Sequence, residues 1–165
     1  MIILETERLI LRRLTPDDAA FILELVNEPA WLEFIGDKNV HSLDDARDYI
    51  LKGPVEMYER LGFGLYLVQL KQGTAIGMCG LIKRPSLDDV DIGFALLSRF
   101  SGQGYAYEAA AAVMDYGKNV LGINRIVAIT NPANQSSIKL LEKLGLQFEK
   151  KLRLSADAPE VALYS

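Results

Sequence analysis

The sequence predicts a mixed α/β fold, with one sheet and helices packed on it. Segments with strand and helix periodicity follow one another in the order strand, two helices, three strands, helix, strand, helix and two strands. The chain has 165 residues, of which 50% are hydrophobic, so it can bury the core of one domain. No linker, repeat or low-complexity tract interrupts it. We therefore expect residues 1–165 to form a single domain.

The first strand and the first helix are predicted near the N-terminus. Residues 8–14 carry alternating side chains with one mixed face, which is typical of a strand. Thr15 can cap the helix that follows, and Pro16 suits its first position. We expect Pro29 to end this helix. Residues 31–36 form a short aromatic segment without a clear period.

A second helix and a hairpin complete the first half of the chain. Ser42 is the predicted cap of the second helix, which Gly53-Pro54 should kink or split. Residues 64–70 and 74–83 read as two strands, and Lys71-Gln72-Gly73 supplies the turn between them.

The stretch from Val90 to Gly117 reads as a strand, a glycine loop and a helix. Residues 90–97 are mostly apolar, and their β-branched and aromatic side chains suit a buried strand. Gly102 and Gly104 permit backbone conformations that other residues resist. From residue 105 small apolar side chains recur at helical spacing. Unpaired N–H groups and the positive end of the helix dipole then point toward one place, which predicts a site for an anion such as a phosphate ester.

The last part of the chain supplies one more helix and three strands. Residues 124–130 are a short β-branched strand, and residues 136–144 form a helix that Gly145 can close. Residues 146–154 and 161–164 are the last two strands.

Composition excludes several function classes. The net charge of −4, without a basic run, argues against nucleic acid as a partner and slightly favours a cationic acceptor. No segment has the length or apolarity of a signal peptide or a membrane span, so we expect a cytoplasmic protein with no membrane partner. Cys79 is the only cysteine and lies in an apolar run, where a buried inert thiol is expected. With His41 as the only histidine, no metal site is expected.

The glycine loop fits neither of two common phosphate-binding patterns. A Walker loop ends in Gly-Lys-Ser/Thr, but Tyr105-Ala106 follows Gly104. A dinucleotide fingerprint needs a third small residue, and Tyr107 occupies that place. Taken alone, the two glycines are equally compatible with an ordinary turn between a strand and a helix.

Four motifs in order resemble the GCN5-related N-acetyltransferases, and within them the branch that acetylates ribosomal-protein N-termini. Residues 99–104 are similar to the Arg/Gln-x-x-Gly-x-Gly/Ala motif for the pyrophosphate of acyl-CoA, and residues 102–109 resemble the branch's G-x-G-Y-A-x-E-A run. Residues 5–12 resemble its opening E-T-x-R-L-x-L-R. Asn134-x-x-Ser137, followed by residues 142–145, resembles its second cofactor segment. The resemblance covers nearly the whole chain.

The resemblance implies an acetyl-CoA site on a mostly antiparallel twisted sheet that splays beside its fourth strand, residues 90–97, with helices on both faces. Pyrophosphate would bind the N–H groups of the glycine loop, and pantetheine would pair with the free strand edge. Asn134 would bind the pantetheine arm from the other side. The implied cofactor-binding residues are Ala95, Leu96, Leu97, Arg99, Phe100, Ser101, Gly102, Gln103, Gly104, Tyr105, Ala106, Asn134 and Ser137.

The family's chemistry is direct attack of a neutral amine on the acetyl thioester, without a covalent enzyme intermediate. This implies an oxyanion donor, for which the backbone N–H of Leu96 is the candidate. Many members use a tyrosine in the last helix to protonate the thiolate, but this chain has Leu141 there. Ser137 is the predicted replacement, directly or through water, and a hydrogen bond at the helix start is its alternative role.

The acceptor side is less defined by sequence. Asp91, Glu33 and His41 are candidates to take the amine proton through water, with solvent as the alternative. Glu108 lies on the helix face opposite the alanines, so we expect a structural or exposed role. Aromatic, acidic and histidine side chains of the variable segments are the candidate acceptor-site residues, with a core role as the alternative for Trp31: Trp31, Glu33, Phe34, His41, Tyr58, Phe63 and Asp91.

The expected partner is an amine-bearing acceptor, either a small molecule or a protein N-terminus. Another small-amine acetyltransferase of the same fold, a non-catalytic acetyl-CoA sensor and a plain structural domain are the competing interpretations. A homodimer is an expectation at the level of the family.

Overall fold

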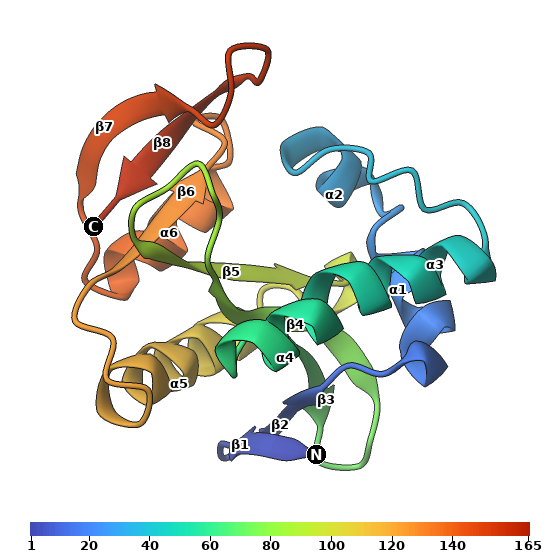
Figure 1. The fold of residues 1–165 in the computed structure, drawn as a ribbon. Coiled ribbons are helices and arrows are strands. Elements are labelled where there is room, and N and C mark those ends of the chain that lie inside the picture. The colour runs from blue at the N-terminus through green and yellow to red at the C-terminus, as the bar shows by residue number, and fades with distance from the viewer.

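The computed structural model describes residues 1–165 and contains one open sheet of eight strands with helices on both faces (Figure 1). The strand order is β1-β2-β3-β4-β5-β6-β8-β7. All neighbouring strands are antiparallel except β5 and β6, which run parallel. The predicted mixed α/β fold with a mostly antiparallel sheet is therefore confirmed.

The predicted strands and helices all occur, with small shifts at their ends. The elements of the first half are β1 (Ile2–Glu5), β2 (Leu9–Arg13), α1 (Ala19–Leu25), α2 (Pro29–Phe34), α3 (Leu43–Ile50), α4 (Glu56–Leu61), β3 (Leu65–Leu70) and β4 (Ala75–Ile82). Those of the second half are β5 (Val90–Leu96), α5 (Tyr105–Asn119), β6 (Ile126–Thr130), α6 (Gln135–Lys143), β7 (Phe148–Arg153) and β8 (Glu160–Tyr164). None of the helices combines the length and apolarity needed to cross a membrane.

Three local predictions differ from the structure. The edge strand β1, which pairs with β2, was not predicted. Residues 31–36, which show no clear period, mostly belong to α2. Pro29 does not end the first helix but opens α2 at its first position, where a missing N–H costs nothing. The predicted distortion at Gly53-Pro54, in contrast, is confirmed: the second helix changes there into a π-helical turn, and the chain continues through it into α4.

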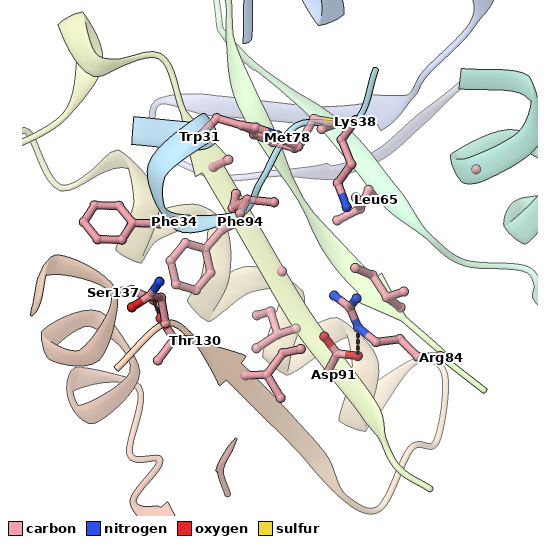
Figure 2. A pocket seen from close by; sticks show the side chains of 18 of the residues that line it. Trp31, Phe34, Lys38, Leu65, Met78, Arg84, Asp91, Phe94, Thr130 and Ser137 are labelled. Atoms are coloured by element: carbon pink, nitrogen blue, oxygen red, sulfur yellow. Dashed lines mark hydrogen bonds and ion pairs between the residues drawn. The ribbon is translucent and has the colours of Figure 1, made fainter. Parts of the chain in front are cut away.

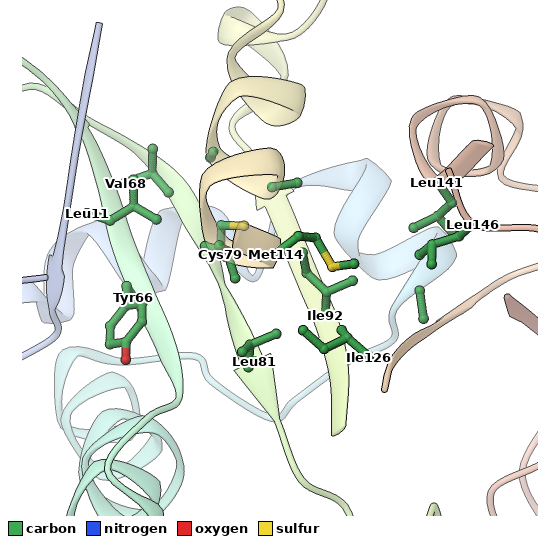
Figure 3. Close-up of a cluster of buried hydrophobic side chains, with 14 of the residues drawn as sticks. Leu11, Tyr66, Val68, Cys79, Leu81, Ile92, Met114, Ile126, Leu141 and Leu146 are labelled. Atoms are coloured by element: carbon green, nitrogen blue, oxygen red, sulfur yellow. The ribbon is translucent and has the colours of Figure 1, made fainter. Parts of the chain in front are cut away.

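Two hydrophobic clusters cover the two faces of the sheet. Successive residues of β3 alternate between them, because Tyr66 and Val68 belong to the larger cluster and Leu67 to the other. The larger cluster, drawn in Figure 3, includes Met114 on α5 and Leu141 on α6. The second cluster is formed with residues of α1, α2 and α3. The helices therefore sandwich the sheet and hold its strands in place.

The sheet splits beside β5. This strand pairs with β4 from Asp91 to Leu96, but it pairs with β6 only at Val90 and Asp91. Helix α5 makes the crossover between these two parallel strands, as parallel pairing requires. Beyond Asp91 the edge of β5 that faces β6 is therefore open. The splay predicted beside this strand is present.

Candidate active site

A pocket of about 330 Å³ opens where β5 separates from β6 (Figure 2). One wall is the stretch of β5 from Ile92 to Ala95. The opposite wall consists of residues 129–131, at the end of β6, and of side chains at the start of α6. Residues of α2 and of the π-helical turn close it from the side. Its size lies at the low end of the range for small-molecule sites.

On the free edge of β5, only every second residue directs its backbone N–H and C=O groups away from β4. The N–H of Leu97 donates to the carbonyl of Ile76 at 2.8 Å, so this residue faces β4. Antiparallel pairing alternates along a strand, and the register continues without a bulge, so Ala95 faces β4 as well. The N–H and C=O groups of Phe94 and Leu96 point to the open side. Of the three residues predicted to pair with pantetheine, only Leu96 therefore offers its N–H on the open side. Phe94 offers its N–H there as well, but it is not among the residues predicted from sequence.

The loop before α5 presents a row of free amide groups. The N–H groups from Gly102 to Tyr107 donate to no protein acceptor. Gly102 has φ +76° and Gly104 has φ +83°, which is the left-handed region that favours glycine. Gly104 is also the residue that precedes the first turn of the 15-residue helix α5. Unsatisfied donors at the positive end of a long helix make this loop suited to an anion.

Arg8 and Glu108 connect this loop by hydrogen bonds to the segment between β1 and β2. The Glu108 carboxylate accepts hydrogen bonds from the Thr6 hydroxyl at 2.5 Å and from the Arg8 side chain and N–H at 2.7 and 2.9 Å. Arg8 in turn donates to the carbonyl of Gln103 at 2.9 Å and lies 4.4 Å from the centre of the Tyr105 ring. Burial raises the pKa of Glu108, but the hydrogen bonds from Thr6 and Arg8 outweigh it, so the pKa is lowered overall. The expected structural role of Glu108 is confirmed.

Three residues predicted at the cofactor site are engaged elsewhere. The guanidinium of Arg99 pairs with Glu24 at 2.7 Å, and both side chains are about half exposed. The N–H groups of Phe100 and Ser101 donate within the turn, to carbonyls at 3.0 and 3.1 Å. Because these two N–H groups are used, the free donors begin at Gly102.

The start of α6 forms the polar wall of the pocket. Asn134 caps the helix by accepting the N–H of Ser137 at 3.3 Å. The Ser137 hydroxyl lies 2.9 Å from that of Thr130, which donates to it. Both hydroxyls line the pocket (Figure 2). Leu141 points instead into the core, where it is 1% exposed, so α6 offers no acid at that position.

The other end of the pocket is charged. Asp91 is 1% exposed, and its Oδ1 accepts a hydrogen bond from Nε of Arg84 at 3.1 Å, while its Oδ2 has no partner. Burial raises the pKa of Asp91, and the positive Arg84 only partly opposes this. Lys38 stands at the rim with its amine directed into the pocket (Figure 2). Burial and the nearby Arg84 lower the pKa of Lys38.

Three of the predicted acceptor-site residues meet in this pocket. Asp91, Phe34 and Trp31 all line it. Trp31 also belongs to the second hydrophobic cluster and is 6% exposed, so the core role weighed for it is correct. Its indole nitrogen has no hydrogen-bond partner.

The other four predicted residues lie outside the pocket. Tyr58 is a core residue, because its buried hydroxyl donates to the carbonyl of Leu65 and accepts the N–H of Leu14. Phe63 packs against the larger hydrophobic cluster. His41 is 61% exposed, near Asp37 on the surface. The fourth residue, Glu33, is exposed on α2.

Sequence reasoning missed Lys38 and Arg84. Both lie in connecting segments without periodicity, so no local pattern points to them. Arg84 has one indirect signal: the β4–β5 hairpin pairs Ile82 with Asp91, which brings residues just after β4 beside that carboxylate. Lys38 has no comparable signal in the sequence.

Comparison with known proteins identifies a family that matches most of this chain. The acetyltransferase (GNAT) domain family matches residues 8–147. The uncharacterized N-acetyltransferase YoaA of Bacillus subtilis is 32% identical over 155 residues, which cover 92% of this chain and 86% of that protein. The uncharacterized protein YkkB of the same organism is 34% identical over 95 residues, 56% of this chain and 55% of that protein. The chain thus matches about half of YkkB but most of YoaA.

Solved structures share the fold over nearly the full length. An acetyltransferase from Agrobacterium tumefaciens is 25% identical, with a TM-score of 0.82 over 98% of this chain and 91% of the other. RimL, described as a ribosomal L7/L12 α-N-protein acetyltransferase in complex with coenzyme A, is 23% identical. It has a TM-score of 0.83 over 99% of this chain and 96% of its own.

Proposed function

Because the chain belongs to the acetyltransferase (GNAT) domain family, we propose that it transfers an acetyl group from acetyl-CoA to a primary amine. The observation that carries the proposal is the row of six free N–H groups from Gly102 to Tyr107, next to the open edge of β5. The free N–H groups and the open strand edge together match a ligand in which a pyrophosphate is joined to a long chain that contains amides.

The residues present fit coenzyme A at both of its polar parts. Pyrophosphate would accept hydrogen bonds from the N–H groups of residues 102–106, and a Cβ built on Gly102 would meet no atom within 4 Å, so the approach is open. The pantetheine amides would pair with the free backbone groups of Leu96 and with the free carbonyl of Phe94. The side-chain amide of Asn134 lines the opposite wall, where it can bind the same arm. Acetyl-CoA would supply the acetyl thioester.

The transferred carbonyl needs a hydrogen-bond donor as its oxygen becomes negative. Leu96 is the donor expected from sequence, and its N–H is free, but Leu96 does not line the pocket. Phe94 has the same orientation and does line it. We therefore assign the oxyanion to the N–H of Phe94 and the pairing with pantetheine to Leu96. One such donor contributes about 3 kcal/mol to transition-state stabilisation.

Two protons must move for the reaction to balance. The amine nitrogen attacks the carbonyl carbon, the C–S bond breaks, and the products are an N-acetyl amine and a free thiol. Ser137, whose hydroxyl accepts a hydrogen bond from Thr130, would donate its proton to the departing thiolate and regain one from solvent. Asp91 is the one predicted base that lines the pocket, but it lies about 10 Å along β5 from Phe94, so the amine proton would pass to solvent, the alternative expected from sequence.

A protein N-terminus is the acceptor we propose. RimL, which shares the fold over 99% of this chain, is described as an α-N-protein acetyltransferase. The pocket supports such an acceptor, because its side toward α2 offers apolar walls for the first residues of a peptide.

The test is thiol release from acetyl-CoA with a panel of short peptides and small amines, followed by mass spectrometry of the panel. We expect an acetylated peptide α-amine and a Ser137→Ala variant with a lower kcat and an altered pH profile. Ser136→Ala is the matched control, because Ser136 is the exposed neighbour on the same helix. Binding of acetyl-CoA without turnover on any amine would instead indicate a sensor and refute the transferase.

A further inference from the structure

The charge inside the pocket has the opposite sign to the charge of the chain. Lys38 and Arg84 are positive and Asp91 is negative, and they are the only charged residues that line it, so the lining carries +1. The chain as a whole carries −4. A cationic acceptor, which the net charge slightly favours, would meet two cations at this end of the pocket. The local charge favours an anionic group there.

Arg84 lines the pocket and has free donors on the two terminal nitrogens of its guanidinium. Asp91 takes only the Nε of its guanidinium, at 3.1 Å, and the two terminal nitrogens form no hydrogen bond with the protein. The buried Asp91 thus orients the guanidinium and leaves its outer pair of N–H groups available. This fork geometry matches a carboxylate.

Lys38 is a second cation without a carboxylate partner. It takes part in none of the chain's ion pairs within 4.0 Å, and its amine points toward the side of the pocket that holds Arg84 and Asp91 (Figure 2). Burial, and in second place the like charge of Arg84, lower the pKa of Lys38, so its charged form is disfavoured in this pocket. An anion bound between them would relieve this repulsion.

We propose that the acceptor is an amine that also carries a carboxylate, and that Lys38 and Arg84 bind this carboxylate. The inference rests on the proposed acetyl transfer and names the substrate class of the same site. Asp91, which positions Arg84, is three residues from Phe94, or about 10 Å along the strand. The carboxylate therefore lies several bonds from the reacting amine. An acidic side chain just after the N-terminus of a peptide has this separation, and so has a free diamino acid that reacts at its distal amine.

The experiment compares pairs of acceptors that differ only in this charge. The peptide pair is Ala-Glu-Phe-amide and Ala-Gln-Phe-amide, and the small-molecule pair is lysine and lysinamide. We expect kcat/KM to be at least about tenfold higher for the acidic member of one pair, and the favoured pair identifies the source of the carboxylate. In Lys38→Gln and Arg84→Gln the ratio should fall to about twofold or less. A general loss of structure would lower both members equally and leave the ratio unchanged.

Lys52→Gln is the matched control, because Lys52 is 82% exposed and lies outside this pocket. It should retain the wild-type ratio. Equal kcat/KM within both pairs would overturn the inference while acetyl transfer stands.

Binding provides a readout that does not depend on turnover. Trp31 is the only tryptophan and lines the pocket, so its fluorescence reports occupancy in the presence of coenzyme A. Tighter binding of the acidic member without acetylation would uphold the carboxylate site and refute the transferase. Equal binding of both members without acetylation would overturn the inference as well.

Discussion

Replacing Glu108 by alanine should destabilise the protein by about 2 kcal/mol. The Glu108 side chain is 19% exposed and accepts three hydrogen bonds, from the Thr6 hydroxyl and from the N–H and side chain of Arg8. A hydrogen bond to a charged group contributes about 1.5–3 kcal/mol. The ion pair itself adds little, because Arg8 is 41% exposed and solvent screens its charge. Water can reach part of the vacated site, so we expect the loss of stability to be smaller than the sum of the three hydrogen-bond contributions.

Thermal unfolding at neutral pH would test this value. For a chain of this size, 2 kcal/mol corresponds to a fall in Tm of about 4–8 °C. Glu142→Ala on α6 is the control, since that exposed carboxylate has no hydrogen bond to a side chain. A Tm within about 1 °C of the wild type for Glu108→Ala would refute the reasoning.

The same substitution should change the pH dependence of stability. Because the folded state lowers the pKa of Glu108 below its ordinary value of 4.5, the ionised carboxylate stabilises the fold above that pH. The contribution is lost as the pH falls below 4.5 and through the folded pKa. The stability difference between wild type and Glu108→Ala should therefore shrink over this acidic range. A constant difference down to pH 2 would contradict the assignment of the hydrogen bonds to the ionised form.

Four further predictions address the site and the core. Gly104→Ala should weaken acetyl-CoA binding at least tenfold by calorimetry. The control is Gly62→Ala at the end of α4, where φ is also positive, at +81°; it should lower stability by a similar amount and leave binding unchanged. Ser137→Ala should lower kcat by about tenfold or more with little change in the KM for acetyl-CoA, and an unchanged kcat would exclude its role as the acid. Gly77→Ala should lose more than about 3 kcal/mol of stability in urea unfolding, because its Cβ would lie 2.2 Å from the carbonyl of β5 residue 95. Burial raises the pKa of Cys79, so a thiol reagent should label it only after unfolding, and rapid labelling of the native protein would contradict its burial.

The backbone geometry of the proposed cofactor side could be predicted from the sequence because its signals are local. The left-handed φ values of Gly102 and Gly104 belong to residues that permit them, and the free N–H groups follow from the start of a helix. Asn134 likewise caps the start of α6, a position that asparagine favours. Each of these features depends on residues within a few positions of one another.

The acceptor side could not be predicted in the same way, because it depends on contacts between distant segments. Tyr58 was expected at the substrate mouth, but its hydroxyl bonds the backbone of β3 and of the segment after β2. Lys38 and Arg84 meet Asp91 only once α2 has packed on the sheet and β4 has paired with β5. The hairpin register gives an indirect signal for Arg84, but nothing in the spacing along the chain indicates that Lys38 shares their pocket.

In the proposed function, the loop from Gly102 to Tyr107 holds the pyrophosphate of acetyl-CoA. Amide NMR of the 15N-labelled protein during titration with acetyl-CoA tests it most directly. We predict large shifts for the six amides of this loop, together with the amides of Phe94 and Leu96, at the same ligand concentration. Saturable binding that leaves the loop amides unmoved would contradict the claim.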